Sequence, residues 1–244
     1  MTKRLWVIFL VGCAVTLSSD SSPEYVKQCS RTDPKLVHCL IDALHHLRPY
    51  LSVGIPEIEL PSVEPFRMDE LTLSLTGGVN GYKIQLRDLY IKGASNYTVE
   101  DIKLGSPFQT IVRMPALILD AHYSSSGVLI ILPASGNGTF HARFGDATAL
   151  VKGTVSTKSR EGKTYLNVEN LDVILGVKDV QMRVSKIFKN NRILTEAINL
   201  FLRENGQEVL KVMEPQLKKK LSALFAEIVN QLLRHLPVES FLTP

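Results

Sequence analysis

The sequence lacks the residue patterns of the common catalytic sites. It contains neither a Gly-x-Ser-x-Gly nor a His-Glu-x-x-His motif, and its glycine clusters lack the lysine and the spacing of a phosphate-binding loop. The adjacent His45 and His46 would point in different directions on a helix, and His122 and His141 could meet only through tertiary packing. Surface or hydrogen-bonded polar roles are therefore expected for the histidines. The sequence predicts no enzyme activity, no metal site and no cofactor.

Cysteine is also scarce. The 244 residues hold 3 cysteines, too few for a thiolate metal site. Cys13 lies in a segment typical of secretory signal peptides, in which Lys3 and Arg4 precede an apolar run from residue 5 to residue 15. Cleavage is expected near Ser18. We therefore predict a signal peptide at residues 1–18 and a single domain at residues 19–244, secreted to the extracellular space.

Loss of the signal leaves Cys29 and Cys39. An even pair in an oxidising compartment predicts a disulfide. Two Asn-x-Thr triplets, at Asn96 and Asn137, fit N-glycosylation of a secreted protein, although such triplets also arise by chance.

Neither sign of charge dominates. The formal net charge of +4 falls to +2 when Lys3 and Arg4 leave with the signal, which argues against nucleic acid as a partner. No internal stretch approaches the roughly 18 apolar residues that span a membrane, so stable membrane anchoring is not expected. The lysine run at 218–220 fits either lipid headgroup contact or a solvated helix face. Three consecutive helical positions cannot face one surface, which favours the second interpretation.

Two kinds of periodicity organise the chain. Asp33-Pro34 predicts a helix start, and Arg48-Pro49 predicts its end. Three prolines between residues 54 and 65 predict an extended edge segment. From residue 68 to about residue 188 a two-residue period predicts an antiparallel, meandering sheet, with a hairpin turn at residues 136–138 and a polar turn at residues 156–163. Small residues within these strands, such as Ala142 and Gly153, permit strong curvature and leave space on the concave face.

The C-terminal segment predicts one long helix, capped by Asn205 and ending near Pro237. Its apolar face contains Leu217, Leu221, Leu224, Phe225, Ile228 and Leu232. A long apolar helix after a strand-rich body suggests a sheet wrapped around the helix, with room for an apolar ligand between the layers. The alternative is that the apolar face is only core.

Four features of the chain occur in a specific order and span almost all of it. They are the close pair Cys29 and Cys39 after a secreted N-terminus; Gly54-Ile-Pro56 with Leu60-Pro61-Ser62 and Glu64-Pro65; Ile91-Lys-Gly93-Ala-Ser95-Asn96; and Phe201-Leu-Arg-Glu-Asn205 through Pro215 to Leu236-Pro237 and Phe241. In this order and spacing they resemble the takeout/juvenile-hormone-binding proteins of insects, and specifically a takeout-type member. Hormone-binding members carry a second disulfide, for which this chain has no cysteines.

The resemblance implies an α+β fold: a long C-terminal helix wrapped by a strongly curved antiparallel sheet that encloses an elongated apolar tunnel. It also implies a non-catalytic carrier of a small hydrophobic ligand, such as juvenile hormone, another terpenoid, a fatty acyl chain or a quinone-like lipid. Haemolymph and sensory fluid are the family's usual locations. One alternative is a membrane- or lipopolysaccharide-binding defence protein of related build, which the low net charge disfavours. Another is a secreted esterase, which lacks a recognisable nucleophile.

Periodicity selects the candidate ligand contacts, with the opposite strand faces as the alternative. The strand candidates are Leu117, Leu119, Phe140, Ala142, Phe144 and Val168, and the helix candidates are Leu224, Phe225, Ile228 and Leu232. A tyrosine hydroxyl could orient an amphipathic ligand in an apolar pocket. The candidates for this role are Tyr82, Tyr90, Tyr97, Tyr123 and Tyr165.

Overall fold

The structure, a computed structural model, describes residues 22–74, 81–129, 132–133, 135–186 and 191–244. The predicted signal peptide at residues 1–18 lies outside the described residues. The helices are α1 (Leu36–Val53), the short 3-10 helix η1 (Pro56–Ile58), α2 (Arg192–Glu204), α3 (Gly206–His235) and α4 (Val238–Phe241). The strands are β1 (Cys29–Ser30), β2 (Phe66–Ser74), β3 (Lys83–Lys92), β4 (Thr98–Lys103), β5 (Phe108–Ser126), β6 (Val128–Leu129), β7 (Leu132–Pro133), β8 (Gly136–Arg160), β9 (Lys163–Val184) and β10 (Leu242–Thr243).

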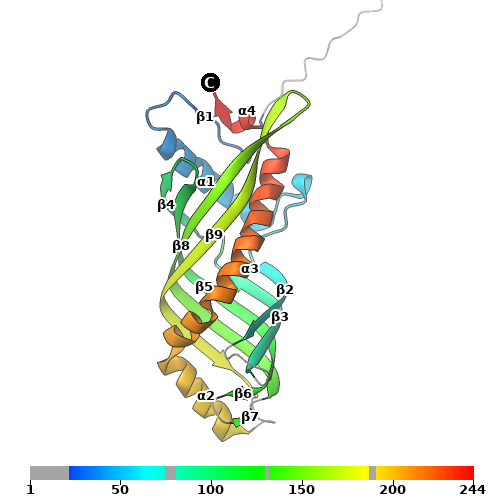
Figure 1. The fold of residues 1–244 in the computed structure, drawn as a ribbon, viewed down its shortest axis with the longest axis vertical. Coiled ribbons are helices and arrows are strands. Elements are labelled where there is room, and N and C mark those ends of the chain that lie inside the picture. Colours follow the sequence, from blue (N-terminus) through cyan, green and yellow to red (C-terminus); the bar gives the residue numbers. More distant parts are fainter. Residues whose placement is uncertain (1–21, 75–80, 130–131, 134, 187–190) are drawn as a thin grey trace, which may run out of the picture.

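One curled antiparallel sheet forms the body of the molecule (Figure 1). Its strand order is β2-β3-β5-β8-β9, and β4 pairs with the first part of β5. The strands β5, β8 and β9 are 19, 25 and 22 residues long, and a strand of this length must twist and bend. Register shifts add local bends, for example between Arg87 and Tyr90 in β3. The predicted antiparallel sheet and C-terminal helix are confirmed.

Helices lie at both ends and along the open side of this sheet (Figure 1). α3 runs along β9, α2 lies at one end, and α1 with the C-terminal strand lies at the other. At that second end, β1 pairs with β10 in parallel, so residues near both ends of the chain are joined. The predicted disulfide between Cys29 and Cys39 is confirmed, with a Cα–Cα distance of 5.9 Å, and it attaches β1 to α1.

Two predictions for the N-terminal region were wrong. α1 does not end at Arg48-Pro49 but continues to Val53, because the Arg48 Nε–H donates to the His45 carbonyl at 3.2 Å, the acceptor that the proline nitrogen cannot use. The segment after it is not simply extended. Pro56 begins η1, since proline fits the first helical position, and Ile55 and Leu60 close the turn with backbone bonds of 2.8 and 3.1 Å.

Two predicted turns in the sheet were also wrong. Residues 136–138 begin β8 and pair with β5. A side chain at Gly138 would place its Cβ 2.1 Å from the Ser185 carbonyl oxygen, so this glycine serves close strand packing. The polar stretch at 156–163 is mostly strand, because β8 and β9 pair up to Arg160 and Lys163. The turn itself is Glu161-Gly162, both with positive φ, as a two-residue hairpin requires.

The predicted cap of the long helix differs as well. Asn205 precedes α3, but its side chain makes no cap for that helix. The Asn205 amide donates instead to the Phe201 carbonyl at 3.0 Å and so closes the end of α2.

Candidate functional site

The side chains of α3 bind the exposed backbone edge of β9. The Asn230 amide accepts from the Val168 N–H at 2.8 Å and donates to the Val168 carbonyl at 3.0 Å. The Ser222 hydroxyl accepts from the Val173 N–H at 2.9 Å. Nearer the start of α3, Gln207 donates to the Val177 carbonyl at 3.0 Å. An edge strand needs partners for its free N–H and C=O groups, and here the helix supplies them.

The opposite edge of the sheet is bound in the same way. Gln216 accepts from the Ser74 N–H of β2 at 2.9 Å and donates to the Ser74 carbonyl at 2.7 Å. Gln231 donates to the Ile58 carbonyl of η1 at 2.7 Å. Because α3 is bonded to both β2 and β9, it covers the open side of the curled sheet. The helix therefore packs against the concave face of the sheet.

The inward apolar face of α3 is incompletely covered. Of the thirty residues of α3, all described, the buried ones are Gly206 and Met213. Leu221, Leu224 and Ile228 each keep part of their surface uncovered. Across the described residues, the large side chains with less than 2% exposure are Leu89 and Val173. Close-packed interiors normally bury such apolar side chains fully, so these side chains are less covered than those of an ordinary core.

The packed side chains form three separate clusters. The first joins α2 and the start of α3 to the sheet and includes Met213 and Leu217. The second lies under α1 and η1 and takes Ile228 and Leu232 from α3. The third belongs to the middle of the sheet, and α3 contributes nothing to it among the described residues. Leu221 and Leu224 belong to none of the three.

The third cluster lies at the level of Leu221 and Leu224. Its residue Val173 bonds through its backbone to Ser222, the neighbour of Leu221. The same cluster contains the small, buried side chains of Ala147 and Ala149 in β8. We call the part of the interior around Leu221 and Leu224, beside this third cluster, the interior slot.

A cavity of about 360 Å³ lies between β9 and the first half of α3. Its apolar lining comes from Leu175, Val177, Leu210 and Leu217, and its charged lining from Glu208, Lys211, Glu214 and Lys218. The apolar residues also belong to the first or third cluster, so the cavity lies where these two clusters meet. Gly176 borders this cavity. A Cβ atom added at Gly176 would lie 4.0 Å from the Thr148 carbonyl oxygen, so the backbone leaves room for a side chain at this position.

The predicted ligand contacts are distributed along the whole interior. The pairs Leu117–Phe144 and Leu119–Ala142 are direct cross-strand neighbours of β5 and β8, and Phe140 lies in the same first cluster as Leu119. Ile228 and Leu232 lie in the second cluster at the other end. Leu224 lies on α3 between the parts of the helix that join the first and second clusters. Val168 is buried beside Asn230, whereas Phe225 is 40% exposed. The structure therefore does not bring these ten residues together at one point, and their contact with a ligand stays a prediction.

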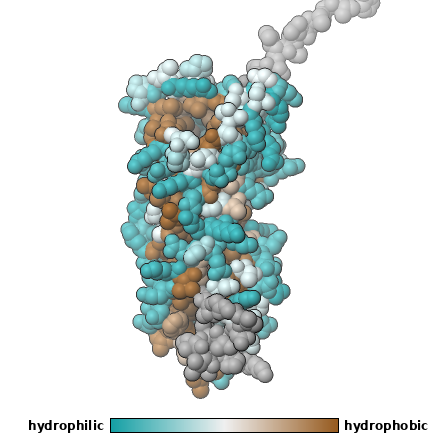
Figure 2. Space-filling view, in the orientation of Figure 1, coloured by the Kyte–Doolittle hydropathy of each residue, from teal (hydrophilic) through white to brown (hydrophobic). Residues whose placement is uncertain are grey.

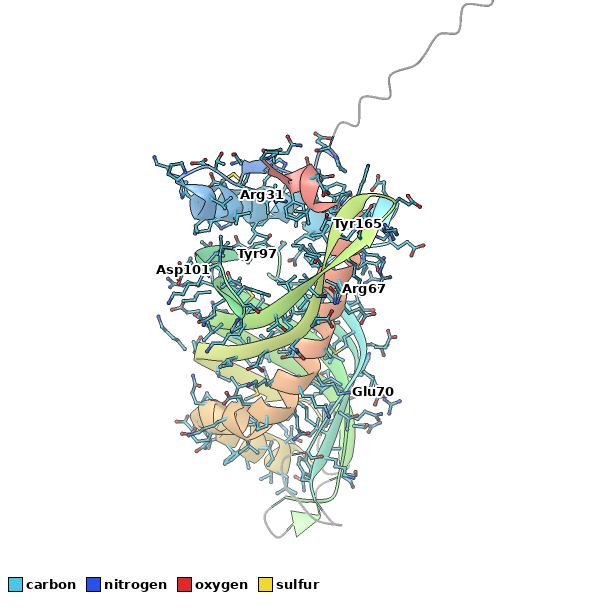
Figure 3. The ribbon with its side chains drawn as sticks, turned by 45° about the horizontal axis from the view of Figure 1, so that its top comes forward. Arg31, Arg67, Glu70, Tyr97, Asp101 and Tyr165 are labelled. Atoms are coloured by element: carbon cyan, nitrogen blue, oxygen red, sulfur yellow. A yellow bond between two sulfur atoms is a disulfide. The ribbon has the colours of Figure 1, made fainter. Side chains whose placement is uncertain are left out.

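The candidate tyrosines differ in burial and in the contacts that they make. The Tyr97 hydroxyl donates to the Leu44 carbonyl, and Tyr97 lies between α1 and β4 (Figure 3). The Tyr123 hydroxyl donates to the Ser185 carbonyl. Burial raises the pKa of both hydroxyls to about 12. Burial also raises the pKa of the Tyr82 hydroxyl. Tyr90 is 40% exposed, and its ring lies 5.4 Å from the Arg67 guanidinium carbon. In the β8–β9 hairpin, the centre of the Tyr165 ring lies 4.4 Å from the guanidinium carbon of Arg160.

Sequence reasoning missed the polar residues that build the interior. Three polar residues of the long helix look like ordinary solvent-facing positions in the sequence: Gln216, Ser222 and Asn230. Nothing in the sequence pattern shows that their hydrogen-bond partners are the edges of strands. The Glu64 carboxylate is a second example, since it accepts from the N–H groups of Gly93 and Ser95 at 2.9 and 3.3 Å. It thereby fixes the turn between β3 and β4 to the segment before β2. Within the described residues, no cluster of three or more His, Cys, Asp or Glu side chains could hold a metal ion.

A curled antiparallel sheet closed by a long C-terminal helix around an apolar interior defines the takeout class of fold. The crystal structure of Epiphyas postvittana Takeout 1 matches with a TM-score of 0.78 and 18% identity, over 90% of this chain and 100% of that chain. The family model described as "Haemolymph juvenile hormone binding protein (JHBP)" matches residues 7–243, and the chain belongs to this family.

Two relatives extend this comparison. The circadian clock-controlled protein daywake of Drosophila melanogaster is 23% identical over 97% of this chain and 95% of its own length. A putative beta-carotene-binding protein of Schistocerca gregaria is 24% identical over 75% of this chain and 74% of its own length.

Proposed function

We propose that this protein is a secreted, non-catalytic carrier that binds one small lipophilic ligand between α3 and the concave face of the sheet. The observation that carries the proposal is the incompletely covered apolar face of α3 at Leu221 and Leu224, which belong to none of the three packed clusters. Apolar surface that the protein leaves uncovered is stabilised when an apolar guest covers it.

The expected affinity follows from burial alone. Burying roughly 400 Å² of apolar ligand surface at about 25 cal/mol per Å² contributes about 10 kcal/mol before the cost of association. Micromolar to nanomolar binding then needs no charged contact. The slot therefore favours a neutral, elongated lipid over a charged or compact one.

The class of ligand is a terpenoid, a fatty acyl lipid or a related long apolar molecule. The family description names juvenile hormone, and the name of the Schistocerca gregaria relative contains beta-carotene, so both comparisons concern long terpenoids. Leu221, Leu224 and Ile228 lie along successive turns of α3 and suit a guest extended parallel to the helix.

The cavity beside Gly176 is the proposed route into the slot. It reaches from the surface to side chains of the first and third clusters, and its charged lining residues lie beside apolar ones. A lipid could enter there without separation of β9 from Ser222 or Asn230.

Residues 1–18 are the proposed signal peptide, and Asn96 and Asn137 the proposed glycosylation sites. Both asparagine side chains are exposed, as an acceptor must be. Expression in insect cells tests this part: the protein should appear in the medium without residues 1–18, and glycosidase treatment should lower its mass.

The carrier function is tested by extraction of the purified protein with organic solvent, mass spectrometry of the extract, and displacement of a fluorescent fatty acid. We expect a co-purified lipid, and displacement by terpenoids or fatty acids. Absence of both would overturn the proposal. Turnover of an added lipid ester, with release of its alcohol, would overturn its non-catalytic part.

A further inference from the structure

The face of α2 that points away from the sheet carries several exposed apolar side chains. Ile193 is 81% exposed, Leu200 is 50% exposed and Phe201 is 44% exposed. Together with the exposed Ala197, these residues follow the spacing i, i+4, i+7 and i+8 of a single helix face. We call this set the outer α2 face. Figure 2 shows hydrophobic side chains at the lower end of the molecule, where Figure 1 places α2.

The orientation of α2 is fixed, so this exposure is a property of the fold. Ile198 and Leu202 pack into the first cluster on the opposite side of the helix. Asn199 accepts from the Val184 N–H at 2.9 Å and donates to the Val184 carbonyl at 3.0 Å. A rotation of α2 about its own axis that buried Ile193 would break both of these hydrogen bonds.

A basic cavity of about 550 Å³ lies beside the same helix. Its cationic lining residues are Arg183, Lys186 and Arg192, and within the described part of the chain the side chains of these three form no ion pair or hydrogen bond. Glu196 supplies the one carboxylate of the lining, and His141 is bound to Asp120 at 2.6 Å. Three unpaired cations around one cavity complement an anion such as a phosphate.

We propose that the α2 end docks reversibly on anionic membrane surfaces, with the outer α2 face in the interfacial layer and a lipid phosphate in the basic cavity. An apolar helix face beside a cluster of cations is the pattern of interfacial membrane binding. In the described part of the chain, no helix is long and apolar enough to cross a membrane. The docking is therefore peripheral, and it does not depend on the carrier function, since no cargo takes part.

The test is sedimentation of the full-length secreted chain with vesicles of phosphatidylcholine, with or without phosphatidylserine. We expect binding to the phosphatidylserine vesicles that weakens with added salt. The double substitution Arg183→Gln with Arg192→Gln should weaken this binding about 25-fold, since each cation near an anionic surface contributes roughly a factor of five. Ile193→Ser with Leu200→Ser should weaken it on both vesicle types.

Matched controls keep the test specific. Val53→Ser alters an apolar side chain that is 77% exposed on α1, and Lys219→Gln removes an exposed cation of α3. Both should bind vesicles like the wild type. All substituted residues are exposed or line an open cavity, and thermal unfolding of each variant checks that it folds.

Four outcomes would overturn the proposal. One is no binding to phosphatidylserine vesicles. Another is equal binding by the wild type and both double variants. The third is concentration-dependent self-association that Ile193→Ser with Leu200→Ser abolishes, because a second copy would then cover the outer α2 face. Inorganic phosphate bound in the cavity without vesicle binding would likewise assign the cavity to free phosphate.

Discussion

The Asn230 side chain occupies the position of a neighbouring β-strand beside Val168. Its amide accepts from the Val168 N–H at 2.8 Å and donates to the Val168 carbonyl at 3.0 Å, so both backbone groups of one edge residue are satisfied by one side chain. Gln216 does the same for Ser74 on the other edge. Through these contacts α3 is hydrogen-bonded to both edges of the sheet and covers its open side.

The first prediction concerns this closure. Asn230→Leu leaves the N–H and C=O of Val168 without partners, and the free energy of unfolding should fall by about 1–3 kcal/mol. Chemical denaturation measures it. Lys219→Leu, on the exposed face of the same helix, is the matched control and should change stability by less than about 0.5 kcal/mol. Equal effects of the two substitutions would show that the Asn230 contact contributes no stability.

The second prediction distinguishes a filled interior from an unfilled one. Leu224→Trp adds volume at the interior slot and should leave the free energy of unfolding within about 1 kcal/mol of the wild type. Met213→Trp adds volume where α3 is buried and should cost about 1–3 kcal/mol. Leu224→Trp should also weaken fluorescent fatty acid binding at least tenfold. The idea of an open slot fails if Leu224→Trp destabilises the fold as much as Met213→Trp does.

The third prediction concerns entry. Gly176→Phe places a ring in the cavity between β9 and α3, where the backbone leaves room for a side chain. Both the association and the dissociation rates of a fluorescent lipid should fall together, with little change in equilibrium affinity. Stopped-flow mixing measures these rates. Gly176→Ala, which changes the backbone preference but adds little volume, should keep the wild-type rates. Unchanged rates in Gly176→Phe would place the entrance elsewhere.

The fourth prediction uses the buried hydroxyl of Tyr97. Burial raises its pKa from 10.0 to about 12 in the folded protein. The folded state therefore holds the proton more tightly than the unfolded state does, and this contribution to stability is complete below pH 10 and is lost as the pH rises to 12. Tyr97→Phe should be less stable than the wild type at neutral pH, because the Leu44 carbonyl loses its donor, and the difference should shrink in this alkaline range. Denaturation at several pH values measures it; a pH-independent difference would contradict it.

Much of the fold could be predicted because its signals are local. Alternation along residues 68–188 indicates the sheet, and the apolar spacing from Leu217 to Leu232 indicates the helix. The errors arose where a side chain or a distant backbone group changes a local rule. Arg48 replaces the donor that Pro49 lacks, and Gly138 sits in a strand because Ser185 approaches it closely. The candidate site was harder, since periodicity selects a face but not a level along it. The partners of Asn230 and Gln216 lie 62 and 142 residues away in sequence.

The central claim is that α3 and the concave sheet leave a slot that an apolar guest occupies. A crystal structure of the protein purified from insect cell medium without delipidation tests it most directly. We predict continuous elongated density along Leu221, Leu224 and Ile228, bounded on the far side by Ala147 and Ala149. Side chains from α3 and the sheet interdigitated along this whole length, with neither density nor an enclosed void between them, would contradict the claim.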